Sequence, residues 1–361
     1  MQILCLDIGS TTQDILLFDT NQLVENAVQL ILPSPTILVA KRIEAATTRG
    51  DTIILTGDTM GGGASTSAIR RHLESGLEVY ATENAARSFR DNLEEVASWG
   101  IQLISTDEVT KFKSGTIIQL ADVELERLEH ALSNWNIALH PDVIAVAVLD
   151  HGVAPPGESD RLWRFKYLEQ LLQANNTLEA FMFSEKEIPR YFTRMQAVVR
   201  TIRGNAPVVI MDTGAAAVLG SSFDPIVASH NDRLAVNIGN SHTLAFNLFG
   251  SRVLGLFEHH TSLLSQARLE NLLLGTIAGN LKGQDIREEG GHGSLIIEKG
   301  VEPFITVTGP RRSLLEHSKL NPYLAAPFGS MMLTGCFGLL KAAAIKLPQW
   351  RDEIEKALLR S

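Results

Sequence analysis

The sequence predicts a layered α/β protein built from two related halves. Short, β-branched apolar runs alternate with segments of helical periodicity, a pattern typical of sheets covered by helices. An internal repeat supports the two halves, because residues 4–9 (Leu-Cys-Leu-Asp-Ile-Gly) are echoed by residues 234–239 (Leu-Ala-Val-Asn-Ile-Gly) at an offset of 230. The composition agrees: 45% of the 361 residues are hydrophobic and 20% are charged, as in a globular protein with a large core.

Each predicted strand follows from a short apolar run, and each predicted helix from a periodic one. The first strand covers residues 3–6, and residues 15–18 return after a polar, glycine-containing tip, which predicts a hairpin. Later strands are expected at 52–55, 77–81, 101–104, 116–120, 143–149 and 208–211. Leucines at helical spacing predict helices near 125–135 and 269–277.

Charge and cysteine content exclude several classes of protein. A net charge of −9 argues against nucleic acid or an anionic membrane as the main partner. The N-terminus lacks the features of a signal peptide, and no apolar run is long enough to cross a bilayer. Cys5 and Cys336 are the only cysteines, which excludes a disulfide framework and an iron–sulfur cluster held by one chain. We expect a cytoplasmic enzyme or binding protein.

The tip of the first hairpin has residue types that suit phosphate and magnesium. Gly9 lets the backbone approach an anion, while Ser10, Thr11 and Thr12 offer hydroxyls. Asp7 can hold Mg²⁺ through water. Taken alone, this tip is equally compatible with an ordinary polar turn.

Four later segments complete a recognisable series. A small-residue segment at 212–220 follows a strand, a second tip spans 237–243, a glycine turn lies within 305–313, and a glycine-containing helix is expected at 328–341. Together with the first tip they resemble the phosphate 1, connect 1, phosphate 2, adenosine and connect 2 motifs of the actin-like ATPase superfamily of actin, heat-shock chaperone ATPases and sugar kinases. The order is the same as in the superfamily, and the resemblance covers nearly the whole chain.

This resemblance implies a two-lobed actin-like (ribonuclease H-like) α/β fold with an interlobe cleft. Its N-terminal lobe would span residues 1–211 and its C-terminal lobe residues 212–339, with a C-terminal helix at 340–361 packing back on the first lobe. Two helices cross between the lobes in this fold, and small side chains let them approach. Ala215, Ala216, Ala217 and Gly220 are therefore expected to face Gly335 and Gly338.

The resemblance also implies ATP or another nucleotide, with Mg²⁺, as cofactors and a role for each motif. Asp7 would be the metal ligand, and Asp212 would orient the attacking water or accept its proton. Arg311 or Arg312 would stack on adenine. The residues expected to contact the nucleotide are Gly9, Ser10, Thr11, Thr12, Asn237, Gly239, Asn240, Ser241, His242, Thr243, Gly309, Arg311 and Arg312.

Two departures bear on activity. Asn237 replaces the usual Asp of the second phosphate loop and so lacks a charge that helps to hold magnesium. Pro310 replaces a common glycine of the adenosine turn and removes a backbone donor. We expect nucleotide binding with slow ATP hydrolysis or phosphotransfer. The alternative is a non-catalytic protein that senses a nucleotide or regulates a partner.

The whole pattern, including the loop at 56–63, most closely resembles a family sometimes labelled pyruvate formate-lyase activating protein-like. That label implies radical chemistry on a three-cysteine cluster, and this chain lacks the cysteine motif, so we do not expect a radical-SAM enzyme. Dehydratase activators of the same superfamily share a cluster across a dimer. Here Cys5 and Cys336 lie in predicted core segments, which argues against that chemistry.

Other residues have a functional and a structural interpretation. The loop at 56–63, before a helix expected near Ser65, is an anion cradle or a flexible loop. Asp150 is the base for a phosphoryl acceptor, such as a small anionic metabolite in a kinase reaction, or the cap of a strand end. Four arginines steer an anion or form a solvated helix face: Arg190, Arg194, Arg200 and Arg203. Histidines 259, 260 and 292 fit no established zinc spacing, and we expect them to be loop or core residues.

Overall fold

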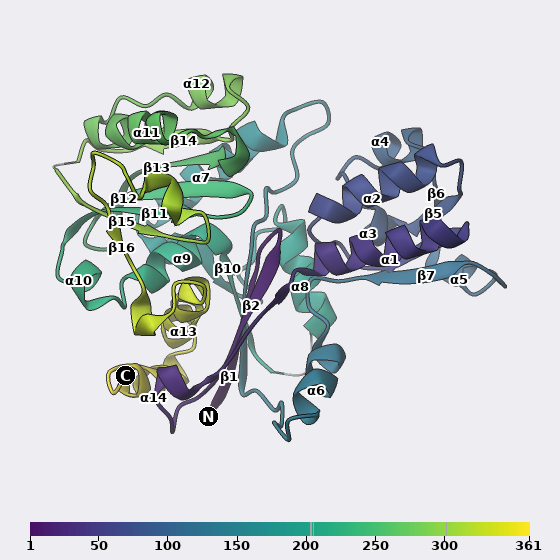
Figure 1. The fold of residues 1–361 in the computed structure, drawn as a ribbon, viewed down its shortest axis with the longest axis horizontal. Coiled ribbons are helices and arrows are strands. Elements are labelled where there is room, and N and C mark those ends of the chain that lie inside the picture. The colour runs from purple at the N-terminus through teal and green to yellow at the C-terminus, as the bar shows by residue number, and fades with distance from the viewer. Residues whose placement is uncertain (203, 205, 301) are drawn as a thin grey trace.

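The computed structural model describes residues 1–202, 204, 206–300 and 302–361, whose strands form three sheets (Figure 1). The first sheet has the order β3-β2-β1-β8-β10-β9, in which β1 pairs antiparallel with β2 and parallel with β8. Its strands are β1 (Gln2–Ile8), β2 (Thr12–Asp19), β3 (Val28–Pro33), β8 (Val143–Val148), β9 (Met182–Ser184) and β10 (Val208–Asp212). The helices of this part are α6 (Leu125–Ser133), α7 (Asp160–Ala174) and α8 (Thr193–Ile202).

The second sheet, with the order β14-β13-β12-β11-β15-β16, repeats the core of the first. Its segment β13-β12-β11-β15 matches β3-β2-β1-β8 in both strand order and strand direction. The strands are β11 (Asp232–Ile238), β12 (His242–Phe249), β13 (Arg252–His260), β14 (Gly293–Ile296), β15 (Phe304–Thr308) and β16 (Tyr323–Leu324). Its helices are α9 (Thr213–Ser221), α10 (Pro225–Ala228), α11 (Gln266–Ala278) and α12 (Gly283–Glu288). The internal repeat predicted from the sequence is therefore confirmed.

A third sheet forms a separate unit between β3 and β8, at the right of Figure 1. Its four strands have the order β6-β5-β4-β7 and are all parallel. The sequence analysis predicted these strands but did not separate them from the first lobe. They are β4 (Ile53–Gly57), β5 (Val79–Thr82), β6 (Ile101–Ile104) and β7 (Thr116–Leu120). The helices of this unit are α1 (Pro35–Arg49), α2 (Gly63–Glu74), α3 (Glu83–Ala86), α4 (Leu93–Ser98) and α5 (Thr106–Val109).

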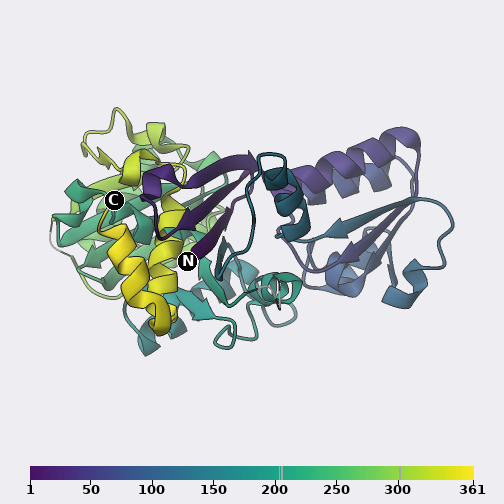
Figure 2. The same cartoon turned by 90° about the horizontal axis from the view of Figure 1, so that it is seen from below.

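The chain ends in two helices, α13 (Thr334–Lys346) and α14 (Arg351–Leu358), which lie close to the N-terminus (Figure 2). Helix α13 packs on strands of the first sheet, and the amino group of Met1 lies 2.9 Å from the carboxylate of Glu353 in α14. Among the described residues, no helix is both long and apolar enough to cross a membrane.

Helices α9 and α13 cross at backbone contact between the two repeated sheets. A Cβ atom on Gly220 would lie 1.8 Å from the carbonyl oxygen of Thr334, and one on Gly338 would lie 2.0 Å from that of Ala216. Any larger residue at either glycine would push the helices apart. Gly335 faces the carboxylate of Asp7 instead of α9. Two matching sheets joined by this crossing are the two-lobed actin-like fold that the sequence predicted.

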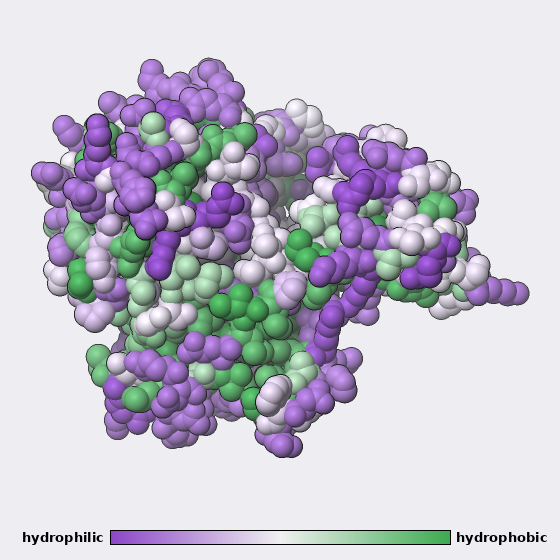
Figure 3. Space-filling model, viewed as in Figure 1, coloured by the Kyte–Doolittle hydropathy of each residue, from purple (hydrophilic) through white to green (hydrophobic). Residues whose placement is uncertain are grey.

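Hydrophilic residues cover most of the face shown in Figure 3, and hydrophobic residues gather over the part where Figure 1 labels β1 and β2. The exposed apolar side chains include Ile31 of the edge strand β3, which is 49% exposed.

Candidate functional site

The tips of the two hairpins have the same backbone geometry. The amide of Gly9 donates to the carbonyl of Thr12 at 2.9 Å, and the amide of Gly239 donates to the carbonyl of His242 at the same distance. In each tip a Cβ on the glycine would lie 3.0 Å or less from that carbonyl oxygen. These residues keep the 230-residue offset, so the repeat extends to the loops that the sequence assigned to phosphate.

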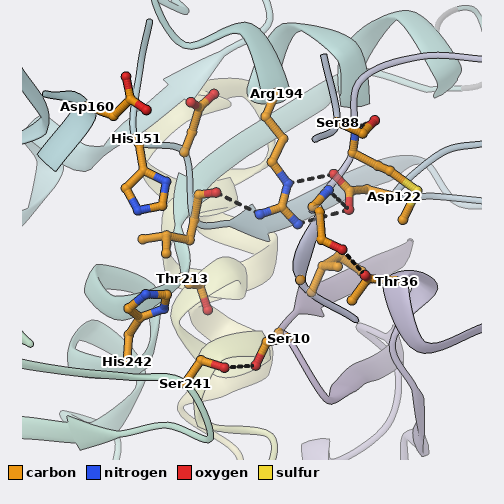
Figure 4. A pocket seen from close by; sticks show the side chains of 18 of the residues that line it. Ser10, Thr36, Ser88, Asp122, His151, Asp160, Arg194, Thr213, Ser241 and His242 are labelled. Carbon is orange, nitrogen blue, oxygen red and sulfur yellow. Dashed lines mark hydrogen bonds and ion pairs between the residues drawn. The ribbon is translucent and has the colours of Figure 1, made fainter. Parts of the chain in front are cut away.

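The two tips touch. The hydroxyl oxygens of Ser10 and Ser241 are 2.6 Å apart, which joins the first lobe directly to the second (Figure 4). On one side of this contact lies a small pocket of about 80 Å³, and on the other a cleft of about 600 Å³. Both cavities are lined by Gly9, Ser10, Thr213, Asn237, Gly239 and Asn240.

Two carboxylates of the first hairpin line the small pocket. Asp7 and Asp14 are directly opposite each other across β1 and β2, so their side chains share a face. Burial raises the pKa of Asp7 to about 7, against the effect of the Thr213 hydroxyl, which donates to Asp7 Oδ1 at 2.5 Å. Burial and the charge of Asp7 together raise the pKa of Asp14 to about 8.

Asp14 is a site residue that the sequence analysis missed. Its Oδ1 atom is buried and has no hydrogen-bond partner among the described residues. A buried, unpaired carboxylate oxygen is costly, which makes Asp14 an acceptor for a cation or a donor group. The sequence does contain a signal for this residue. Side chains alternate between the two faces of a strand, so Asp14 lies on the same face as Thr12 and, in a hairpin, on the same face as Asp7.

The second hairpin and the adenosine turn form the other wall of the pocket. Asn237 is paired with Thr308 across β11 and β15. Gly309 has a φ of +97°, and a Cβ there would lie 2.6 Å from Asn237 Oδ1, so only glycine fits this turn. Pro310 also lines the pocket.

Several residues expected at the nucleotide line neither cavity among the described residues: Thr11, Thr243, Arg311 and Arg312. The Thr243 hydroxyl is buried against that of Thr261 at 3.0 Å. Arg312 donates to the carbonyl of Ala325 at 3.1 Å, and Arg311 is exposed. Because neither arginine lines a cavity among the described residues, neither is placed to stack on a base in this structure.

Asp212 is buried behind the hairpins and has several hydrogen-bond partners. Its Oδ1 accepts the amides of Gly214 and Ala215 at the start of α9. Its Oδ2 accepts Nη2 of Arg164 at 2.9 Å. Both oxygens of Asp212 therefore already accept hydrogen bonds from protein groups.

Arg164 is the largest fully buried side chain and connects three segments. Besides Asp212 it binds Oε2 of Glu258 at 2.6 Å and the carbonyl of Asp150 at 2.8 Å. The sequence analysis did not identify Arg164, because an arginine within a helix usually faces solvent.

Asp150 lies two residues after the end of β8, as a strand-end cap would. Its two oxygens accept the amides of Gly152 and Met195, both at 2.9 Å. Burial raises the pKa of Asp150, although these two amides and the nearby arginines act in the opposite direction.

The arginines of α8 hold the third sheet. Arg194 forms two hydrogen bonds with Asp122, at 2.7 and 2.9 Å, and Arg200 forms two with Asp58, both at 2.7 Å (Figure 4 shows the first pair). Both aspartates lie just after strands of that sheet, so these pairs fix its position on the first lobe. Arg203 lies outside the described residues, and Arg190 borders neither cavity.

The loop at 56–63 lines the large cleft, but hydrogen bonds already occupy part of it. The amide of Gly61 donates to Asp122 at 3.2 Å, and that of Met60 donates to Ser88 at 3.0 Å. Helix α2 begins at Gly63, close to the expected start near Ser65.

Four histidines gather at the large cleft. His151 and His242 lie on one side of it, across from the pair of Arg194 and Asp122 (Figure 4). The Nε2 atoms of His151 and His292 are 2.9 Å apart, and the rings of His260 and His292 are 4.7 Å apart. Burial is the main reason why the pKa of each of the four imidazoles is lowered, that of His260 to about 4.

The three sheets and the paired hairpins define an α/β protein with the two-lobed actin-like fold. More narrowly, the chain belongs to the family described as "Putative pyruvate format-lyase activating enzyme (DUF1786)", whose model matches residues 60–314. The sequence has no match among curated proteins.

Solved structures with similarity to this chain include a hexokinase, a putative sugar kinase and a dehydratase activator. A hexokinase of the ROK type from Thermus thermophilus is 12% identical, over 70% of this chain and 49% of its own, with a TM-score of 0.24. The match therefore spans about half the length of the hexokinase. A protein from Listeria monocytogenes titled "a putative N-acetylmannosamine kinase" is 10% identical, over 95% of this chain and 98% of its own, with a TM-score of 0.35. The activator of 2-hydroxyisocaproyl-CoA dehydratase from Clostridium difficile, with bound ADPNP, is 10% identical, over 100% of this chain and 98% of its own, with a TM-score of 0.33.

The two cysteines do not support the activity in the family description. Cys5 and Cys336 are both completely buried, and Cys336 Sγ lies 3.1 Å from the carbonyl oxygen of Asp14. Within these 361 residues the chain therefore cannot supply three cysteine ligands to an iron–sulfur cluster.

Proposed function

We propose that this protein binds ATP with Mg²⁺ between the two hairpin tips and acts as a slow ATPase or a phosphotransferase. The observation that carries this proposal is the pair of matching tips that face each other over the buried carboxylates of Asp7 and Asp14. Backbone amides at tight glycine turns are good phosphate donors, and paired carboxylates suit Mg²⁺.

The residues present fit a magnesium ion. Asp14 Oδ1 is buried without a partner among the described residues, and Asp7 and Asp14 both line the small pocket. Asp7 and Asp14 would hold the cation, and the tips at Gly9 and Gly239 would hold the phosphates. When bound, the ion would neutralise phosphate charge and thereby favour attack at phosphorus.

The small pocket is in a closed state. A volume of about 80 Å³ admits a hydrated cation or a phosphate group, whereas drug-sized ligands occupy pockets of about 300 Å³ or more. Nucleotide entry therefore requires the hydrogen bond between Ser10 and Ser241 to break, so that the tips separate. Since both cavities share the tips as a wall, separation would connect the phosphate site with the large cleft.

The large cleft would hold the phosphoryl acceptor in the kinase reaction. Arg87, Arg90 and Arg161 line it together with carboxylates such as Asp91 and Asp160, and the arginines would contact the charged group of a small anionic metabolite. Asp150 lines the cleft two residues after β8, so Asp150 would serve the acceptor. Asp212 lines neither cavity among the described residues and would reach the attacking water only after the tips separate. Each aspartate would first have to exchange one of its present partners.

A matched pair of variants tests catalysis. Asp212→Asn keeps the shape of the residue and should slow ATP hydrolysis by about 100- to 10,000-fold, as for loss of a general base. Affinity for magnesium–ATP should change little. Asp224→Asn is the control, because Asp224 is also a buried aspartate at a helix start, but at α10. Equal hydrolysis by the two variants would remove Asp212 from the reaction.

A second candidate is a non-catalytic nucleotide sensor, and the state of Asp212 favours it. Arg164 occupies Oδ2 of Asp212, and Asn237 supplies no second charge for the metal. The two functions differ in one observable. A sensor binds magnesium–ATP without consuming it, with or without pools of small anionic acceptors, whereas an enzyme releases ADP.

A further inference from the structure

Four side chains that are far apart in the sequence meet at the edge of the large cleft. They are His151, His242, Glu258 and His292, and one ligand atom from each lies within 4.8 Å of those of all the others. We propose that this cluster binds a divalent transition-metal ion, with Zn²⁺ as the probe. This proposal is independent of the nucleotide site.

Strand alternation explains why these donors share one face. In β13, Glu258 and His260 point to one side and His259 to the other, where its ring packs against Ile286 and Gly291. His242 is paired with His260 across β12 and β13, and so joins the same face. His292 follows because its amide donates to the carbonyl of Glu258 at 3.1 Å.

Two buried donor atoms in the cluster have no partner. Glu258 Oε1 and His292 Nδ1 make no hydrogen bond among the described residues, although both residues are 1% exposed. The two atoms are 3.8 Å apart. Leaving two such atoms unpaired is costly, and a shared cation would satisfy both.

The donor types suit a transition metal better than Mg²⁺. Imidazole nitrogen together with one carboxylate is a common donor set for Zn²⁺, whereas Mg²⁺ prefers oxygen. Glu258 and Asp212 contribute two negative charges, which Arg164 and Arg161 offset with two positive charges. A tetrahedral zinc ion places its ligand atoms about 3.4 Å apart, so small side-chain rotations would close the cluster.

Arg164 would position the carboxylate ligand. It binds Oε2 of Glu258 at 2.6 Å and so leaves Oε1 as the oxygen for the metal. Outer partners of this kind orient ligands in known metal sites.

The cluster would also connect the lobes. His151 follows β8 of the first lobe, whereas the other three donors belong to the second sheet or the loop before β14. His242 comes directly after Ser241, which already touches Ser10 across the cleft. A bound ion would therefore hold the lobes in the closed arrangement and border the space where an acceptor would lie.

The test is a calorimetric Zn²⁺ titration of the full chain after chelator treatment, in excess Mg²⁺ so that carboxylate sites are occupied. One Zn²⁺ should bind per chain, and Co²⁺ in its place should give the intense visible absorption of a four-coordinate nitrogen and oxygen site. His151→Ala and His292→Ala should weaken Zn²⁺ binding by about 100-fold or more. His130→Ala, at an exposed position on α6, should bind as the wild type does.

His151→Ala keeps the test decisive if His292→Ala fails to fold, because His151 is only half-buried. Circular dichroism checks the fold of each variant. Absence of Zn²⁺ binding by the wild type, or equal affinity in the folded His151→Ala variant, would overturn the metal site. Asp7→Ala should retain zinc, which separates failure of this site from failure of the nucleotide site.

Discussion

The two hairpins that face each other across the cleft have the same backbone geometry but different side chains at equivalent positions. In the first, Asp7 lies opposite Asp14; at the same positions of the second, Asn237 lies opposite Leu244. The tight glycine turn is present in both. The comparison shows that the repeat preserves the tight glycine turn in both lobes, whereas only the first hairpin has carboxylates at these two positions.

Each hairpin packs against a glycine at the start of a crossing helix. A Cβ on Gly335 of α13 would lie 1.9 Å from Asp7 Oδ2, and a Cβ on Gly214 of α9 would lie 2.1 Å from Leu244 Cδ2. In the first lobe the helix backbone packs on a carboxylate, and in the second it packs on an apolar side chain. The proposed metal would therefore depend on the first hairpin more than on the second.

The largest expected effect separates the two hairpins directly. Asp7→Ala should weaken magnesium–nucleotide binding by about 100-fold or more, because it removes a charged ligand. Asn237→Ala is the matched change in the second hairpin and should cost less than about tenfold, as for one neutral hydrogen bond. Calorimetry with a nonhydrolysable nucleotide measures both affinities. Equal losses would show that the hairpins share the metal.

Asp14→Asn should have opposite effects on stability and on binding. Removing one of two facing, buried carboxylates should raise the free energy of unfolding of the metal-free protein by about 1–2 kcal/mol. The same change should weaken Mg²⁺ binding by about tenfold or more. Urea unfolding in chelator and Mg²⁺ titration in the presence of nucleotide measure the two effects. A loss of stability in chelator would contradict the repulsion between Asp7 and Asp14.

Asn237→Asp tests whether charge can be restored to the second hairpin. The new carboxylate has nearly the same shape and should tighten magnesium binding in the nucleotide complex by about tenfold. Metal-free ATP should bind more weakly, since the carboxylate repels the phosphates. Titration with ATP, with and without Mg²⁺, measures both shifts. If the metal dependence stays that of the wild type, Asn237 does not face the nucleotide.

The smallest expected effect concerns the contact between the tips. Ser241→Ala removes the hydrogen bond to Ser10, which is worth about 1 kcal/mol and opposes separation of the lobes. Nucleotide association should become about fivefold faster in stopped-flow measurements. A slower association would indicate that Ser241 itself binds the phosphates.

Local sequence patterns predicted much of the fold. The strands expected at 101–104 and 116–120 match β6 and β7, and the repeat at Asp7 and Asn237 predicted the two lobes. Alternation of apolar runs depends on near neighbours and can be recognised in one chain. The separate third sheet could not be recognised in this way, because its independence depends on how strands pair and not on their composition.

The parts of the site that depend on long-range contacts could not be predicted. The histidine cluster takes donors from four distant segments, and spacing rules examine only neighbouring residues. Arg194 and Arg200 were candidates for steering an anion, but their partners, Asp122 and Asp58, come from another sheet. Arg164 lies within an ordinary helix, and only its buried partners show its role.

The most direct test of the magnesium–nucleotide site is a crystal structure of the full chain with Mg²⁺ and ADPNP. The account predicts that the phosphates lie between the turns at Gly9 and Gly239, that the Ser10–Ser241 contact is broken, and that the metal lies against Asp7 and Asp14. A nucleotide bound elsewhere, with Asp7 and Asp14 facing no cation, would contradict it.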